Sequence, residues 1–290
     1  MIQLVKQKAG HIPIAFLCKH FGVSKSGYYN WSINCEPVSF KRKKARCTMI
    51  LEVFEASGRS YGSPRVHKEL LEKGVHISEN TVAKYMNELG LDARYKKKFK
   101  VQTTDSQHSL PIAQRLIKTE DMTTLPAAPG QVLAGDITYL KYGENRFVYL
   151  AVVIDLFTRE VLGWSMQTSL KTKIVLNALE SAMQKVGPDA EVIFHSDRGS
   201  QYASEAFRKF CKLGNVLPSM SRRGNCYDNA YVESWFASLK KERIYRRKFK
   251  TEEELRADVF DYIEVWYSKR RKHSSLGYQS PSSFRKNHAA

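Results

Sequence analysis

VLAGDITYL (132–140), FVYLAVVIDLF (147–157) and EVLGWSMQ (160–167) are the three stretches that decide the fold of this chain. Each is short, apolar and rich in β-branched or aromatic residues, which is typical of a β-strand. The connections between them are GEN (143–145) and TR (158–159), which are short enough for tight turns. The pattern therefore predicts an antiparallel meander of three strands, with an acid inside the first.

Helices and strands alternate after this meander. KTKIVLNALESAMQKVG has the broad apolar face of a packed helix. The predicted elements are a helix over 171–187, a strand over 191–197, a helix over 204–215, a strand over 216–220 and, after a polar loop, a long helix over 230–242. The order β-β-β-α-β-α-β-α predicts an α/β fold, a mixed sheet with helices on its faces. We assign residues 129–245 to this core and 246–290 to a basic extension of it.

The first hundred residues are predicted to be helical. Residues 1–40 contain LCKHFGVSKSGYYNW, which is typical of a helix, a glycine turn and a second helix. Residues 41–100 contain a second helix-turn-helix candidate: Ser63-Pro64 is expected to cap one helix, and Ser78 starts another. For the first candidate, a small helical hairpin without DNA contact remains the alternative. Residues 101–128 lose periodicity and are expected to be a linker.

The charge of the chain is unevenly distributed. The formal net charge is +18. Residues 1–125 carry 21 basic and 11 acidic side chains, residues 126–220 carry 10 and 9, and residues 221–290 carry 16 and 9. This balance argues against an acidic, disordered or membrane-spanning protein and favours a polyanionic partner, nucleic acid above all. We expect Lys96, Lys97 and Lys98, in a basic arm after the helical pair, to contact phosphates.

The cysteines and the hydropathy of the chain argue against disulfide-rich, zinc-finger and membrane-spanning proteins. The five cysteines are odd in number, and none form a C-x-x-C pair, so neither a disulfide framework nor a zinc finger is expected. No apolar run reaches the roughly 18 residues of a transmembrane helix, and the N-terminus does not resemble a signal peptide. A cytoplasmic location without membrane contact is the expectation.

Three carboxylates stand where strands or helices could bring them together. Asp136 lies inside the first strand, Asp197 follows the fourth, and Glu233 lies on the last long helix. A carboxylate in an apolar strand is costly to bury unless it is paired. A divalent ion such as Mg²⁺ would pair it, and metal-bound carboxylates serve phosphoryl displacement. Acids are common, however, so position alone leaves the trio open; Asp155 is better explained as a turn residue and Asp228 as an N-cap.

The motifs of the core also carry a family resemblance. In order they are GDITYL, VVIDLFTREVLGW, HSDRGSQY, SRRGNCYDNAYVESWFASLK and HSSLGYQSP, with 35 residues between Asp197 and Glu233. They resemble the retroviral-integrase superfamily, and more closely the downstream-frame (OrfB-type) transposases of bacterial insertion sequences. The resemblance covers roughly residues 45–285, including the second helix-turn-helix candidate. The chain lacks the N-terminal His₂Cys₂ zinc module of retroviral integrases.

The resemblance implies a fold and a chemistry. It implies an RNase H-like core in which Asp136, Asp197 and Glu233 are both the catalytic residues and the ligands of Mg²⁺ or Mn²⁺. It also implies Lys240, two helical turns after Glu233, as a DNA contact beside the metal. Two positions depart from the family pattern: Leu133 stands where a Trp is usual, and AQRLIK is a degraded form of the linker. Neither touches the implied metal ligands.

The resulting hypothesis is a DNA transposase that cleaves the ends of an insertion sequence and joins them to target DNA. The expected DNA contacts in the C-terminal third are Arg222, Arg223, Lys240, Lys241 and Arg243, with SKRRKHSS (268–275) as a further basic patch. Trp235 and Phe236 are expected in the core rather than against bases. Bringing two DNA ends together implies a homo-oligomer, and the product of an upstream frame is a further expected partner. A non-catalytic DNA-binding regulator and a nuclease on the same core remain the alternatives.

Overall fold

The computed structural model describes residues 2, 11–33, 38–93, 110–117, 126–187, 190–222 and 230–288. The chain divides into two compact units, Met1–Ala93 and Arg94–Ala290. Within the described ranges, no helix has the length and apolar character that crossing a membrane requires.

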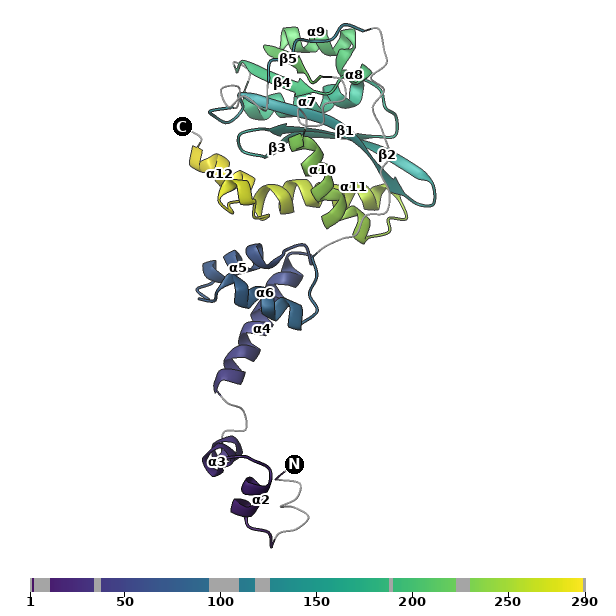
Figure 1. Cartoon of the computed structure of the whole chain (residues 1–290). Helices are drawn as coiled ribbons and strands as arrows, with labels where there is room; N and C mark the ends of the chain where they lie inside the picture. The colour runs from purple at the N-terminus through teal and green to yellow at the C-terminus, as the bar shows by residue number, and fades with distance from the viewer. Residues whose placement is uncertain are drawn as a thin grey trace. The chain divides into compact units, whose positions relative to one another are not determined.

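The described part of the first unit is helical. Its helices are α2 (Ile14–His20), α3 (Lys25–Ile33), α4 (Val38–Ala56), α5 (Ser63–Glu72) and α6 (Glu79–Glu88) (Figure 1). Between α2 and α3 the chain turns at Gly22, whose φ of 66° suits a residue without a Cβ. Leu17, Cys18 and Tyr28 form a small buried cluster there with Ile2.

Helices α4, α5 and α6 contact one another around a second small core. The buried side chains are Ile50, Val53 and Phe54 on α4, Val66 and Leu70 on α5, and Val82 and Met86 on α6. Helix α6 starts as the sequence predicts: Ser78 is its N-cap, and the Ser78 Oγ accepts a hydrogen bond from the Thr81 amide at 3.2 Å. Helix α5 starts one residue earlier than predicted. Its N-cap is Gly62, so Ser63 lies inside the helix, because Pro64 fits either the first or second helical position.

The second unit is built on a five-stranded sheet. The strands are β1 (Val132–Tyr142), β2 (Arg146–Asp155), β3 (Val161–Gln167), β4 (Val192–Ser196) and β5 (Val216–Met220), in the order β3-β2-β1-β4-β5. β1, β2 and β3 pair antiparallel, which confirms the predicted meander. β4 pairs parallel with both β1 and β5, so the sheet is mixed and β1 lies at its centre.

Helices cover both faces of this sheet, as Figure 1 shows. On one face lie α7 (Lys173–Val186), α8 (Ser200–Ala203) and α9 (Glu205–Leu213); on the other lie α10 (Ala230–Glu242), η2 (Ile244–Arg246), α11 (Glu252–Phe260) and the π-helix η3 (Asp261–Tyr267). The 3₁₀-helix η4 (Ser274–Leu276) and α12 (Pro281–His288) complete the chain. Alternate residues of β1 serve the two cores: Val132, Ala134 and Leu140 face α10, whereas Leu133 faces α7. The expected fold class, a mixed-sheet α/β core preceded by a helical region, is confirmed.

One close approach explains a glycine in β3. A Cβ on Gly163 would lie 2.0 Å from the carbonyl oxygen of Ala178 and 2.6 Å from the amide nitrogen of Ala182. Both atoms belong to the backbone of α7, which cannot yield as a flexible side chain would. Helix α7 therefore packs onto the sheet at a distance that only glycine permits.

Two segments outside the predicted core pack against it. From the basic extension, Leu255, Val259, Tyr262, Ile263 and Tyr267 enter the same buried cluster as β1, β2 and α10. Trp235 and Phe236 lie in that cluster too, as predicted. From the expected linker, residues 110–117 lie against β5: the Leu116 amide donates to the Ser219 Oγ at 2.9 Å, and Ile117 is buried.

Candidate active site

The register of β1 and β4 brings two of the predicted acids together. The strands pair in parallel, with Ala134 opposite His195. Asp136 stands two residues after Ala134 on β1, and Asp197 stands two residues after His195, one residue beyond the end of β4, so continuing this register brings the two side by side. Parallel strands lie roughly 4.8 Å apart, close enough for the two carboxylates to share a ligand. Both residues line the same pocket, beside the end of β4.

Asp136 is held in an environment that disfavours its charge. Its Oδ1 accepts a hydrogen bond from the Ile137 amide at 2.7 Å. Burial is the main cause that raises the pKa of Asp136 well above its usual value, and the Asp197 carboxylate is the next. The Glu233 charge raises this pKa further, whereas Lys240 and the Ile137 amide lower it. The fold thus brings the carboxylates of Asp136 and Asp197 together, with the charge of Glu233 acting on Asp136, and a cation would stabilise this arrangement.

Asp197 is fixed by the turn that follows β4. Its Oδ1 accepts a hydrogen bond from the Gly199 amide at 2.9 Å. A Cβ on Gly199 would lie 3.0 Å from that same oxygen, so glycine allows the close approach. The neighbouring Arg198 donates from Nε to the Ser221 carbonyl at 2.8 Å and ties the turn to the end of β5.

Tyr202 belongs to the same pocket and was not among the predicted site residues. Its side chain is buried between the rings of Phe194 and Phe207. Burial raises the pKa of Tyr202 well above its usual value, and the charges of Asp136 and Asp197 raise it further. The signal was present in the sequence, because Tyr202 ends the motif HSDRGSQY.

Helix α10 carries Glu233, Lys240 and Lys241 among the predicted site residues. Glu233 lies in its first turn and is exposed. Lys240 lies near its end, where its Nζ donates to the Thr138 Oγ1 at 2.6 Å and sits 5.2 Å from the centre of the Tyr139 ring. The structure therefore brings α10 against β1 beside Asp136. Within the described ranges, however, no group of three or more His, Cys, Asp or Glu side chains has the arrangement of a metal centre.

The donor chemistry of the pocket fits a hard divalent cation. Carboxylate oxygens are the ligands that Mg²⁺ and Mn²⁺ prefer, and Asp136 and Asp197 both present them in the pocket. Burial above all, and then the neighbouring charge of Asp197, raises the pKa of Asp136, and a bound cation would offset both costs of its ionised form. Asp136 and Asp197 are thus suited to hold the ion, and Glu233 is near enough for its charge to act on Asp136.

Asp155 is a turn residue, as the sequence indicates. It is 1% exposed and ends β2. Its Oδ1 accepts from the Phe157 amide at 3.1 Å, and its Oδ2 accepts from the Thr158 hydroxyl at 2.7 Å. Both carboxylate oxygens are therefore used inside the turn. Asp228 lies outside the described residues.

The predicted DNA contacts differ in their surroundings. Lys241 and Arg222 are exposed. Arg243 is largely buried and pairs with Asp261 at 2.8 Å and with Asp258 at 3.5 Å, so much of its charge is compensated inside the fold. Sequence reasoning could not identify those partners, which lie 15 and 18 residues away. Lys96, Lys97, Lys98 and Arg223 lie outside the described residues.

Comparison with known proteins adds family information to this geometry. Residues 41–99 match the model of an HTH-like domain, and residues 126–226 and 215–281 each match an integrase core domain. The chain is 38% identical over 270 residues to an insertion element IS600 uncharacterized 31 kDa protein of Shigella sonnei, covering 93% of this chain and 97% of that protein. It is 37% identical over 282 residues to the transposase InsF for insertion sequence IS3A of Escherichia coli, covering 97% and 96%. Among solved structures, the HTLV-2 integrase catalytic core domain in complex with magnesium aligns with 15% identity and a TM-score of 0.42, covering 55% of this chain and 98% of that one.

Proposed function

The chain belongs to the insertion-sequence transposases that combine an HTH-like domain with an integrase core domain, and from that premise we propose that it cuts and joins DNA through Asp136, Asp197 and Glu233. Cleavage at an end of the element adds water across a phosphodiester bond and frees a 3′-OH. That hydroxyl then attacks a phosphorus of the target DNA: a new P–O bond forms, and the 3′ oxygen of the target strand leaves. No covalent bond between protein and DNA is required.

The observation that carries this proposal is the meeting of Asp136 and Asp197 in one pocket, with the charge of Glu233 acting on Asp136. Two like charges in a partly buried site are costly to maintain. Two carboxylates kept close together at this cost in free energy are typical of a site that binds a cation and a reacting phosphate. A regulator that only binds DNA has no use for clustered carboxylates on a strongly basic chain.

Asp136, Asp197 and Glu233 would hold Mg²⁺ or Mn²⁺. When bound, such an ion lowers the pKa of a coordinated water and stabilises the charge that develops on the phosphate. Asp136 is positioned by the central strand β1, and Asp197 by the turn that follows β4. Lys240, held against β1, would neutralise the DNA backbone beside the carboxylates.

DNA binding is the proposed role of the HTH-like domain and of the basic side chains around the core. Lys84, Asn80 and Asn87 are exposed on α6, the second helix of the α5–α6 pair, which is the helix that enters the major groove in a helix-turn-helix. Lys241 and Arg222 offer further contacts near α10 and β5, and we place Lys96, Lys97, Lys98, Arg223 and the partly compensated Arg243 with them. Because transposition joins two ends of one element, the active form is proposed to be a homo-oligomer, with the upstream-frame product as a further partner. We propose a cytoplasmic location for this activity, because its substrate would be DNA and the similar proteins come from bacteria.

The test is cleavage and strand joining on DNA that carries the terminal repeats of the element. The wild-type protein is expected to release a 3′-OH and to join it to target DNA only with Mg²⁺ or Mn²⁺. Asp136→Asn, Asp197→Asn and Glu233→Gln are expected to lose both reactions and still bind the repeats. Wild-type rates in all three variants would contradict the proposal. Binding without any reaction would favour the regulator, and cutting without joining would favour the nuclease.

A further inference from the structure

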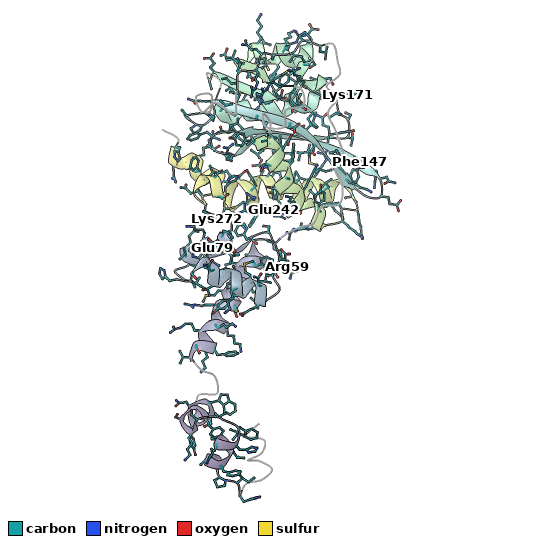
Figure 2. All side chains as sticks on the ribbon, viewed as in Figure 1. Arg59, Glu79, Phe147, Lys171, Glu242 and Lys272 are labelled. Carbon is teal, nitrogen blue, oxygen red and sulfur yellow. The ribbon has the colours of Figure 1, made fainter. Side chains whose placement is uncertain are left out.

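Glu242, the last residue of α10, forms a buried ion pair with Arg271 from the C-terminal segment. Arg271 donates from Nε to both carboxylate oxygens of Glu242, at 3.0 and 2.9 Å, and from Nη2 to Oε1 at 2.7 Å. Both side chains are buried, with 5% of Arg271 and 10% of Glu242 exposed. Figure 2 labels Glu242 beside the C-terminal helices.

Three further side chains surround this pair. The Tyr262 hydroxyl donates to the Glu242 Oε2 at 3.0 Å, and the Arg271 Nη2 donates to the Ser238 Oγ at 3.4 Å. The guanidinium of Arg271 also lies 5.5 Å from the centre of the Tyr267 ring. Burial lowers the pKa of Arg271, but Glu242 together with Tyr262 and Tyr267 outweighs this effect, so the pKa rises above its usual value. The pair is therefore charged and enclosed.

The origin of Arg271 ties the pair to the sheet. The arginine follows the continuous helical run of α11 and η3, whose Leu255, Val259 and Ile263 are buried in the core beneath the sheet. The Arg271 amide donates to the Trp266 carbonyl at 2.7 Å. This anchorage means that the guanidinium has a set position relative to the strands, including β1.

The energetics point to a role other than stability. Burying an ion pair costs several kcal/mol per ion before attraction is counted, and apolar side chains of similar volume often stabilise a fold equally well. The apolar contacts of α10, through Val232, Trp235, Phe236 and Leu239, are not directional and permit small slides or rotations. A bidentate arginine–carboxylate contact permits far less, because two parallel hydrogen bonds define an orientation.

We propose that Arg271 is a positioning residue that, through Glu242, sets the axial position and rotation of α10. That helix carries Glu233 and Lys240, so the pair fixes where both stand relative to Asp136. Glu233 is nine residues from Glu242, which corresponds to about 13.5 Å along the helix. The role in catalysis rests on the proposed function; the effect on α10 does not.

The test replaces the pair by apolar residues of similar size, Glu242→Leu with Arg271→Met, in the full-length protein. Three quantities are measured: the thermal midpoint, the amide hydrogen exchange of α10 against that of α7 on the opposite face, and the rate of strand joining. We expect the variant to have a thermal midpoint close to that of the wild type. Relative to the wild type, its amide exchange should accelerate in α10 but not in α7. Its rate of strand joining should fall on the order of 10- to 100-fold. Arg271→Lys keeps the charge but not the bidentate hydrogen bonds of the guanidinium. It is expected to accelerate exchange in α10 and to slow strand joining, both to a smaller degree.

The matched control is the pair Glu160–Arg285, which joins α12 to the β2–β3 connection at 3.2 Å. Glu160→Leu with Arg285→Met is expected to leave both the exchange of α10 and the joining rate at wild-type levels. Equal acceleration of exchange in α10 and α7, or unchanged exchange in α10, would overturn the proposal. So would faster exchange in α10 with a wild-type joining rate. If the wild-type protein itself joined no strands, the proposed function would fail, while the exchange data would still decide whether Arg271 positions α10.

Discussion

Lys240 on α10 donates a hydrogen bond from its Nζ to the Oγ1 of Thr138 on β1, at 2.6 Å. Thr138 is 5% exposed and stands two residues after Asp136, so both side chains lie on the same face of the strand. The contact places the ammonium group next to the carboxylates, where it lowers the pKa of Asp136. A DNA phosphate reaching Lys240 would therefore also be beside the candidate metal ligands.

Replacing Thr138 by Val is expected to release Lys240. Val has nearly the shape of Thr but lacks the hydroxyl, so the expected loss of stability is about 1 kcal/mol. The joining rate should fall roughly tenfold, because a misplaced contact weakens the stabilisation of the reacting phosphate. Thr138→Ser retains the hydroxyl and should recover most of the rate. Equal rates for the Val and Ser variants would show that the hydroxyl has no part in placing Lys240.

Asp155→Asn tests whether the acid at the end of β2 is only a turn residue. The change weakens bonds to the Phe157 amide and the Thr158 hydroxyl, so unfolding should become easier by about 1–2 kcal/mol. Below its unfolding temperature, the variant should cut and join DNA at close to the wild-type rate, unlike Asp136→Asn. Chemical denaturation and a cleavage assay at 20–25 °C measure the two effects. Loss of activity in a folded Asp155→Asn protein would place Asp155 in the site.

Gly163→Ala is expected to damage the fold more than any surface change. The added methyl group would meet backbone atoms of α7 at 2.0 and 2.6 Å, so helix and sheet would have to separate. We expect a loss of several kcal/mol or failure to fold. Gly214→Ala is the control, because its nearest contact would be an ordinary 3.4 Å from the Phe210 carbonyl oxygen. Circular dichroism during thermal unfolding compares the two variants.

Cys211 predicts a specific pH dependence of stability. Burial raises the pKa of this thiol to about 12. The unfolded thiol ionises near pH 8.5, so between about pH 8.5 and 12 the folded state holds a proton that the unfolded state releases. Stability from this residue is therefore complete below pH 8.5 and falls as the pH rises, by about 2 kcal/mol at pH 10.

The measurement compares unfolding of the wild type and Cys211→Ala at pH 7 and pH 10. The variant starts less stable because it loses buried volume, but its further loss between the two pH values should be smaller. Parallel losses in the two proteins would mean that the thiol does not contribute. The folded wild type should also resist alkylation of Cys211 at pH 8.

The outer face of α6 is expected to read DNA. Lys84→Ala should weaken binding to the terminal repeats and reduce the salt dependence of binding by about one charge if the contact is to a phosphate. Asn80→Ala should instead reduce the preference for the repeats over unrelated DNA, by about 1–3 kcal/mol. Lys212→Ala on α9 removes the same charge elsewhere and serves as the control for Lys84. Fluorescence anisotropy at several salt concentrations separates these outcomes.

Local patterns were sufficient for most elements of the predicted core, although the helices of residues 246–290 were not predicted. The strands β1 to β3, the glycine-terminated helices α5 and α6, the turn role of Asp155 and the burial of Trp235 all follow from residue preferences within a few positions. The three acids were candidates from their positions along the chain, and the family motifs supported them and added Lys240. Tyr202 was missed although it stands in one of those motifs, because a lone tyrosine carries no local signal of its depth in the fold.

What the sequence by itself determined is the order of the elements, their apolar faces and the identity of the acids, since these depend on neighbours along the chain. Only the tertiary structure decided which charges face each other. Arg243 and Arg271 read as surface cations in the sequence, yet Asp261 and Glu242 meet them inside the fold. The parallel register of β1 and β4, which unites Asp136 and Asp197, was equally unreadable. The reason is physical: electrostatic attraction and repulsion depend on distance in space and on burial, and the chain sets both only when distant segments pack together.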